Sequence, residues 1–153
     1  EANGIVLHDI INNFFAKKAI DKGADGLVAV AAGAGGHAGK LSPFALVREV
    51  RQFFSGPIAL SGAITDGSGI LACESMGADF AYMGTRFIAT NEANASDAYK
   101  NMIIDSKAKD IVYTPFFTGV HGNYLLKSIV SSGLDPRDIM NGDKIHKNTV
   151  KYN

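Results

Sequence analysis

A single histidine stands inside a glycine-rich segment, Ala32–Gly39, and offers the clearest opportunity for chemistry in this chain. Glycine has no Cβ, so the backbone amides of Gly35 and Gly36 can approach a flat or anionic ligand closely. His37 follows directly and stands within reach of such a ligand, and an imidazole exchanges protons near neutral pH. Glycine-rich loops are common, however, so the segment alone also fits a surface loop with an incidental histidine.

Two further segments, Ser61–Gly67 and Met83–Phe87, combine small residues with hydroxyl groups just after apolar runs. Each follows the end of an expected strand and leads toward the N-terminus of an expected helix, where backbone amides favour anions. The candidate phosphate ligands are the backbone amides and hydroxyls of Ser61, Gly62, Ala63, Gly84 and Thr85. Tight turns between a strand and a helix explain the same residues without any ligand.

The elements that position these segments alternate between short apolar runs and longer helical patterns, which is typical of βαβ units and a parallel sheet. We expect strands at Ile5–His8, Gly26–Ala31, Pro57–Ser61 and Asp79–Met83. A repeat of the form Gly-Ala-Asp at residues 23–25 and 77–79 supports this division into units. The fold class is therefore α/β, and the units fit the last four of a (β/α)8 TIM barrel, whose phosphate sites follow strands seven and eight.

Three helices are expected between these strands. Asn12 or Asn13 caps the first, Ser42 before Pro43 caps the second, and Thr65 or Asp66 caps the third. Gly23, Gly56 and Gly77 are the expected helix stops. The apolar stripe of the second helix comprises Phe44, Val47, Val50, Phe53 and Phe54, and that of the third comprises Ile70, Leu71, Cys73 and Met76.

The pattern changes after Thr90. We expect a helix capped by Ser96, a strand at Ile111–Thr114, an aromatic loop at Phe116–Gly122, a helix at Asn123–Ser132 and a helical turn at Pro136–Met140. The predicted organisation is the C-terminal half of a (β/α)8 barrel over residues 1–90, a helical and aromatic-loop segment near the active site over residues 91–140, and a polar tail over residues 141–153.

Composition restricts the function classes. Apolar residues make up 46% and charged residues 20% of the chain, and 15 basic residues balance 15 acidic ones, which argues against disorder and against a nucleic-acid partner. No apolar run approaches the length of about 20 residues that a membrane helix needs. No Cys, His and carboxylate spacing indicates a metal site. The lone cysteine, Cys73, is expected to be a buried small hydrophobe, and a reduced, cytoplasmic compartment follows.

Three ordered motifs resemble the nitronate monooxygenase family, formerly called 2-nitropropane dioxygenases. They are Ala34–Gly39, Pro57–Ile64 and Gly77–Thr90, and the similarity extends from about Gly4 to Ile139. The resemblance implies an FMN-dependent barrel that oxidises alkyl nitronates with dioxygen to a carbonyl compound and nitrite. It also implies that His37 is the catalytic histidine, and that Ser61-Gly62-Ala63 and Gly84-Thr85 contact the FMN phosphate.

Members of this family contain four further strand–helix units upstream, which is about 125 residues at about 31 residues per unit. We therefore expect this chain, which opens with Glu1, to be a fragment that corresponds to the C-terminal half. Strands without their neighbours leave apolar side chains uncovered, so the expected partner is the missing half or a second copy, beside the small-molecule substrate.

Two other functions stay open. The FMN-dependent enoyl-acyl-carrier-protein reductases share the fold and much of the glycine and histidine pattern, but they also need NAD(P)H. Alternatively, the chain is a catalytically silent half-barrel that keeps a phosphate cradle. Arg86 fits a phosphate ligand or, slightly better, a surface salt bridge, and His121 fits a position at the entrance of the site.

Overall fold

The computed structural model describes residues 3–141, and the chain folds as two compact units. Unit 1 comprises Glu1–Ala34 and Ala38–Gly84, and unit 2 comprises Gly35–His37 and Thr85–Asn153. The predicted polar tail at residues 141–153 lies outside the described residues except for Asn141. No helix among residues 3–141 is both long enough and apolar enough to cross a membrane.

Unit 1 contains a four-stranded parallel sheet, which confirms the predicted α/β class. Its strands are β1 (Leu7–Ile10), β2 (Gly26–Val30), β4 (Ile58–Ser61) and β5 (Phe80–Ala81), in the order β1-β2-β4-β5. We expected the first strand to begin at Ile5, but it begins two residues later, at Leu7. The Val6 amide before it donates to the Asp25 carboxylate at 2.8 Å.

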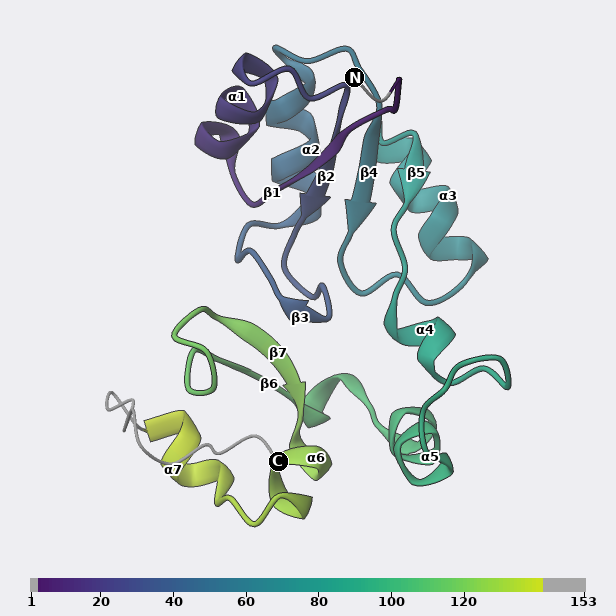
Figure 1. Ribbon diagram of the computed structural model, residues 1–153, viewed down its shortest axis with the longest axis vertical. Coiled ribbons are helices and arrows are strands. Elements are labelled where there is room, and N and C mark those ends of the chain that lie inside the picture. The colour runs from purple at the N-terminus through teal and green to yellow at the C-terminus, as the bar shows by residue number, and fades with distance from the viewer. Residues whose placement is uncertain (1–2, 142–153) are drawn as a thin grey trace. The chain divides into compact units, whose positions relative to one another are not determined.

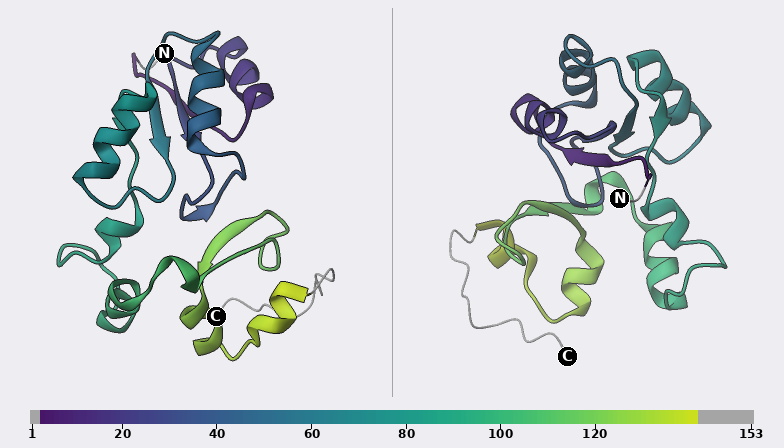
Figure 2. Two further views of the ribbon diagram at one scale, coloured as in Figure 1. Left: turned by 180° about the vertical axis from the view of Figure 1, so that it is seen from behind. Right: turned by 45° about the horizontal axis from the view of Figure 1, so that its top comes forward.

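Three helices connect these strands and pack along one face of the sheet (Figures 1 and 2). They are α1 (Asn13–Asp21), α2 (Pro43–Arg51) and α3 (Gly67–Met76). Successive parallel strands that are neighbours in space, joined by right-handed crossovers, place every crossover helix on the same side of the sheet. This singly wound arrangement is that of a (β/α) barrel, whereas a doubly wound fold has helices on both faces.

The core of unit 1 lies between the sheet and these helices. Alternate strand residues point toward the helices, and the buried cluster includes Ile10, Leu27, Ala29, Ile58 and Leu60 from the strands with Leu46, Val47 and Val50 from α2. Two predicted members of the α2 stripe are wrong, since Phe44 is 66% and Phe53 39% exposed. Leu46 occupies the sheet-facing position instead, because it lies on the same helix face as Val50.

Helix α3 buries fewer of its apolar side chains than its sequence pattern indicated. Only Cys73 is buried in α3, whereas Ile70 and Leu71 are exposed and Met76 is half-buried against the core. The apolar residues of α3 are spread around the helix rather than gathered in one stripe, so only one of them can face the short strand β5. The prediction of Cys73 as a buried small hydrophobe is confirmed.

Helix ends follow the sequence signals in most places. Asn12 accepts from the Phe15 amide to cap α1, Asp66 accepts from the Gly69 amide to cap α3, and Gly77 ends α3 with a φ of 101°. Ser42 makes no side-chain cap bond to α2, contrary to expectation. Gly56 does not end α2 either, because the helix stops at Arg51 and the amides of Phe53 and Phe54 turn back to the Val50 carbonyl.

Unit 2 contains an antiparallel sheet, of which only the strand at Ile111–Thr114 was predicted, and that strand is confirmed. Its strands are β3 (Gly36–His37), β7 (Gly122–Leu125) and β6 (Ile111–Thr114), in that order. Its helical elements are α4 (Thr85–Ile88), α5 (Asp97–Asp105), η1 (Ala108–Asp110), α6 (Leu126–Ser131) and α7 (Pro136–Asn141). Ser96 caps α5 as predicted. The predicted helix at Asn123–Ser132 is wrong in its first three residues, because pairing with β6 holds residues 123–125 extended, and it is confirmed from Leu126 to Ser131.

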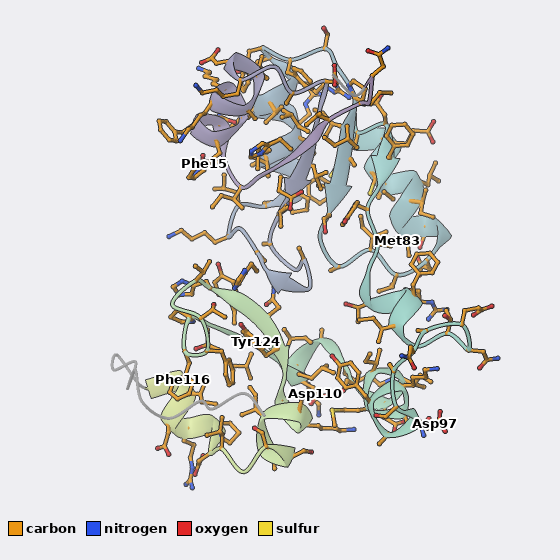
Figure 3. All side chains as sticks on the ribbon, viewed as in Figure 1. Phe15, Met83, Asp97, Asp110, Phe116 and Tyr124 are labelled. Carbon is orange, nitrogen blue, oxygen red and sulfur yellow. The ribbon has the colours of Figure 1, made fainter. Side chains whose placement is uncertain are left out.

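A small apolar cluster stabilises unit 2. Val112, Ile129 and Ile139 are buried, and the rings of Phe116, Phe117 and Tyr124 pack against them. Phe117 lies 5.4 Å from Phe116 and 4.6 Å from Tyr124, measured between ring centroids. Figure 3 labels Phe116 and Tyr124 among the side chains of this unit. The aromatic loop between β6 and β7 is therefore partly a core element.

Candidate functional site

The strand-end loops of unit 1 lie side by side, as the parallel sheet requires. The strands β4 and β5 pair in parallel with Leu60 opposite Ala81, and the Tyr82 amide donates to the Leu60 carbonyl at 2.7 Å. Ser61 and Gly62 therefore follow one strand and Gly84 follows its neighbour at the same edge of the sheet. This is the edge where barrel enzymes build their active sites.

Close packing between two loops accounts for part of the small-residue pattern. The Ala63 amide donates to the Gly33 carbonyl at 3.0 Å. A Cβ on Gly33 would lie 2.9 Å from the Cβ of Ala63, and a Cβ on Gly62 would lie 2.9 Å from the Ala32 carbonyl oxygen. Ala63 itself adopts a left-handed conformation with a φ of 53°. The Ala63 amide thus already donates to the Gly33 carbonyl. Among the five predicted phosphate ligands, Ala63 is therefore the least supported.

Two amides at this edge remain available to a ligand. Among residues 3–141, the backbone amides of Gly62 and Gly84 donate to no protein acceptor. A Cβ added to Gly84 would meet nothing within 4 Å, so a ligand can approach this backbone closely. The half-buried Ser61 places a hydroxyl at the end of β4. These groups fit an anionic phosphate, which backbone amides and hydroxyls bind well.

The N-terminus of α3 does not add to this cradle, contrary to expectation. The Asp66 carboxylate caps the helix by accepting from the Gly69 amide at 2.9 Å and from the Ser68 hydroxyl at 2.7 Å. A second anion there would meet the negative charge of Asp66. The groups that fit a phosphate are thus those at the ends of β4 and β5.

In unit 2, the glycine-rich segment brings Gly35 against a hydroxyl. A Cβ on Gly35 would lie 2.8 Å from Thr85 Oγ1, so only glycine fits there without a shift. Gly36 has a φ of 71°, a conformation that favours glycine. The two predicted cofactor residues Gly35 and Thr85 are therefore neighbours within this unit.

His37 is part of the short strand β3 rather than a loop. It pairs with Gly122 of β7, and its side chain is exposed. Its Nε2 lies 2.8 Å from Thr118 Oγ1. Thr118 was not predicted as a site residue, and its only sequence signal is its position beside Gly119 in the aromatic loop. The histidine is thus held at two points, by its backbone and by its ring.

The remaining candidates are peripheral. Arg86 in α4 is exposed. Neither of the two ion pairs among residues 3–141 includes Arg86, so the surface salt bridge that we expected for it is absent from this part of the chain. The His121 ring stacks on Tyr113 with 5.0 Å between centroids.

Burial raises the pKa of the Cys73 thiol, which keeps it protonated. Within the described part of the chain, no group of three or more metal-ligating side chains is assembled.

The singly wound parallel sheet, with ligand-ready loops at the carboxyl ends of its strands, defines an α/β protein of the TIM-barrel class. A sequence model of nitronate monooxygenases matches residues 2–138. The chain belongs to the nitronate monooxygenase family, which confirms the resemblance of its three motifs.

Individual relatives agree with this assignment. A nitronate monooxygenase from Paraburkholderia phytofirmans is 32% identical over 124 residues, which cover 75% of this chain and 34% of the relative. A probable nitronate monooxygenase from Staphylococcus aureus is 37% identical over 107 residues, which cover 63% of this chain and 30% of the relative. The chain thus spans about a third of the length of the curated relatives it matches.

Solved structures show the same fold. FabK from Thermotoga maritima superposes with a TM-score of 0.74 at 29% identity, over 89% of this chain and 45% of that protein. A nitroalkane oxidase from Streptomyces ansochromogenes superposes with a TM-score of 0.72 at 29% identity, over 79% of this chain and 38% of that protein. Both are TIM-barrel enzymes, which confirms the predicted fold class.

Proposed function

We propose that this chain contributes the phosphate cradle and the catalytic base of an FMN-dependent oxidoreductase that converts alkyl nitronates and dioxygen to a carbonyl compound and nitrite. Family membership supports an oxidoreductase, and the similarity to a nitroalkane oxidase supports a nitro compound as the substrate. The observation that carries the proposal is the pair of unpartnered amides, Gly62 and Gly84, at adjacent strand ends.

The residues that would hold FMN follow from the donors available. The amides of Gly62 and Gly84 and the hydroxyl of Ser61 would bind the phosphate, with Gly84 offering open space for its approach. Gly35, Gly36 and the Thr85 hydroxyl, which lie in unit 2, are the other candidate cofactor ligands. When bound, FMN supplies the one- and two-electron chemistry that no protein side chain offers.

His37 would act on the carbon acid. A neutral nitroalkane must lose its α-proton before it becomes a nitronate, and an unprotonated imidazole can accept that proton as a general base. Once charged, the same ring pairs electrostatically with the nitronate anion. The exposed position of His37 at the edge of its sheet leaves the ring accessible to a small molecule.

Nitrite release by the FMN-loaded protein tests this function. We expect His37→Ala to retain flavin but to lose about 100-fold or more of kcat/KM on a neutral nitroalkane, which is the usual contribution of a general base. The loss on the preformed nitronate should be much smaller, because that substrate needs no proton removed. The His37→Gln variant, which keeps a polar side chain of similar size, should behave like His37→Ala.

The same preparation separates the alternatives. NADH oxidation with an enoyl thioester, in the absence of nitrite release, would identify an enoyl reductase. A protein that binds FMN but turns over neither substrate would be a silent phosphate-binding domain. Equal rates for the wild type and His37→Ala on both nitro substrates would remove His37 from the chemistry.

A further inference from the structure

The Thr118 hydroxyl makes three polar contacts that together restrict where its proton lies. Its Oγ1 is 2.8 Å from His37 Nε2, 3.0 Å from the Val120 carbonyl oxygen and 3.3 Å from the Val120 amide nitrogen. A hydroxyl has one proton to donate and two lone pairs that accept. A carbonyl oxygen only accepts and a backbone amide only donates, so the direction of two of these contacts is fixed.

Only one arrangement satisfies all three contacts. If Thr118 donates its proton to the Val120 carbonyl, its two lone pairs accept from the Val120 amide and from His37 Nε2. If Thr118 instead donated to His37, the contact with the Val120 carbonyl would lose its proton, leaving two hydrogen bonds rather than three. The first arrangement therefore requires a proton on Nε2 of His37.

The surrounding backbone keeps Thr118 in place. The Gly119 amide donates to the Pro115 carbonyl at 2.8 Å, and Gly119 has a φ of 78°, so the loop closes in a tight turn at Thr118. A Cβ on Gly122 would lie 2.9 Å from the Gly36 carbonyl oxygen, so the glycine at position 122 permits β3 to approach β7. The His37 ring on β3 and its hydroxyl acceptor in the loop between β6 and β7 are thus held within one unit.

We infer that Thr118 is a positioning residue that anchors Nε2 of His37, so that Nδ1 is the nitrogen that exchanges a proton with the substrate. The inference rests on the proposed role of His37 as a base. A neutral imidazole carries one proton, so a proton fixed on Nε2 leaves the lone pair on Nδ1. When His37 becomes charged, Nε2 still donates to Thr118, so the ring exchanges its proton without turning over.

Nuclear magnetic resonance of the purified protein labelled with 15N-histidine tests this without flavin or substrate. Above the pH at which the His37 ring becomes neutral, we expect Nε2 to resonate as protonated and Nδ1 as unprotonated. In Thr118→Val, which removes the hydroxyl at similar volume, the two tautomers should exchange and the two shifts should move toward each other. Thr118→Ser, which keeps the hydroxyl, should match the wild type.

A wild-type spectrum with the proton on Nδ1 would overturn the inference, and so would identical nitrogen shifts in the wild type and Thr118→Val. If Thr118→Val does not fold, the wild-type tautomer and that of Thr118→Ser decide the matter. In the flavin-loaded protein, Thr118→Val should lower kcat on a neutral nitroalkane about tenfold with KM little changed and with the nitronate rate preserved. Absence of any nitrite release would contradict the proposed function but leave the tautomer measurement standing.

Discussion

Ala63 shows how one residue couples the candidate site to stability. A residue with a side chain pays about 1–2 kcal/mol to adopt the left-handed conformation, because its Cβ approaches the following carbonyl oxygen. Ala63 adopts this conformation beside two glycines, Gly33 and Gly62, that leave no room for a Cβ. Backbone strain of this kind is frequent at functional sites. The strained residue directly follows Gly62, whose amide we propose as a phosphate donor.

We predict that Ala63→Gly raises the free energy of unfolding by about 0.5–1 kcal/mol, because glycine accepts the positive φ without strain. Gly33→Ala is the matched opposite change. It should destabilise by at least about 1 kcal/mol, since its Cβ would lie 2.9 Å from that of Ala63 at a φ of 89°. Urea denaturation of both variants measures these changes, and a destabilised Ala63→Gly would show that the turn is not strained.

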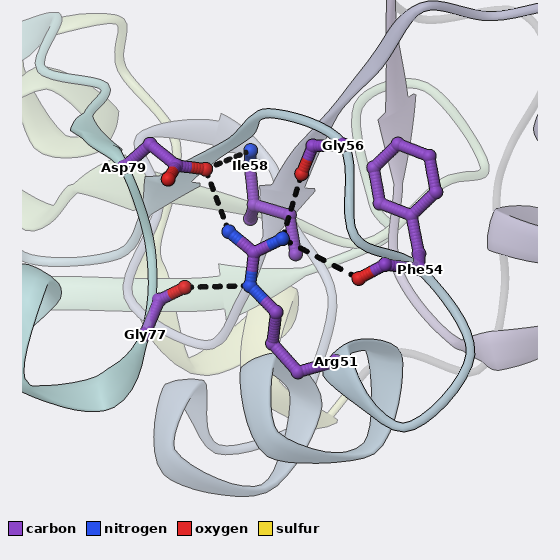
Figure 4. Close-up of polar contacts among 6 residues, drawn as sticks. All are labelled: Arg51, Phe54, Gly56, Ile58, Gly77 and Asp79. Atoms are coloured by element: carbon purple, nitrogen blue, oxygen red, sulfur yellow. Dashed lines mark hydrogen bonds and ion pairs between the residues drawn. The ribbon is translucent and has the colours of Figure 1, made fainter.

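At the scale of elements, one arginine ties together the amino-terminal side of the sheet in unit 1 (Figure 4). Arg51, at the end of α2, donates to the carbonyls of Gly56 at 2.6 Å and Gly77 at 2.7 Å, and forms an ion pair with Asp79 at 2.6 Å. The same Asp79 oxygen accepts from the Ile58 amide at 2.8 Å. The cluster links α2, the C-terminus of α3 and the entries to β4 and β5, at the ends of these strands opposite to the candidate site.

The charge state of Asp79 makes this cluster sensitive to acid. The hydrogen bond from the Ile58 amide and the neighbouring Arg51 guanidinium hold the pKa of the Asp79 carboxyl below its ordinary range. A carboxyl whose pKa is lowered by folding stabilises the fold fully above its unfolded pKa, about 3.9, and loses this contribution as the pH falls through the lower folded pKa.

We therefore predict that Asp79→Asn lowers the free energy of unfolding by about 1 kcal/mol near pH 7, a small value because the Asp79 side chain is 49% exposed. The difference from the wild type should stay constant from pH 8 to about pH 5 and shrink below about pH 4. A double-mutant cycle with Arg51→Met isolates the pair. If the difference in free energy of unfolding between the wild type and Asp79→Asn does not change with pH, the ion pair adds nothing to stability.

Local signals in the sequence predicted the parallel strands of unit 1 and both ends of α3, since the cap at Asp66 and the stop at Gly77 act within one turn. They failed at α2, where Ser42 makes no cap bond and the helix stops before Gly56. The antiparallel sheet of unit 2 was not predictable in this way. Its strand β3 has two residues and is held by a partner more than 80 residues away in sequence. For the same reason the contact between Thr118 and His37 could not be predicted from the sequence.

At the scale of the whole chain, the sheet of unit 1 ends in two strands, β1 and β5, with apolar side chains uncovered. Leu7 is 46%, Phe80 60% and Tyr82 57% exposed, which agrees with the expectation that these strands leave apolar surface open. Phe80 lies in β5 and Tyr82 directly after it, four and two residues before Gly84. A bound flavin would thus meet apolar side chains along β5, which suit its ring system, and backbone groups in the loop that follows, which suit its charged phosphate.

We propose that the strand-end loops of unit 1 bind FMN by its phosphate. Riboflavin lacks this phosphate, so a comparison of FMN with riboflavin tests the proposal most directly. By fluorescence titration of the purified protein we expect FMN to bind at least about tenfold more tightly, because each charge-assisted hydrogen bond contributes about 1.5 kcal/mol or more. Gly84→Asp should abolish the preference by opposing two negative charges, whereas the neutral Gly84→Asn should keep most of it. Equal affinities of the wild type for FMN and riboflavin would contradict the account.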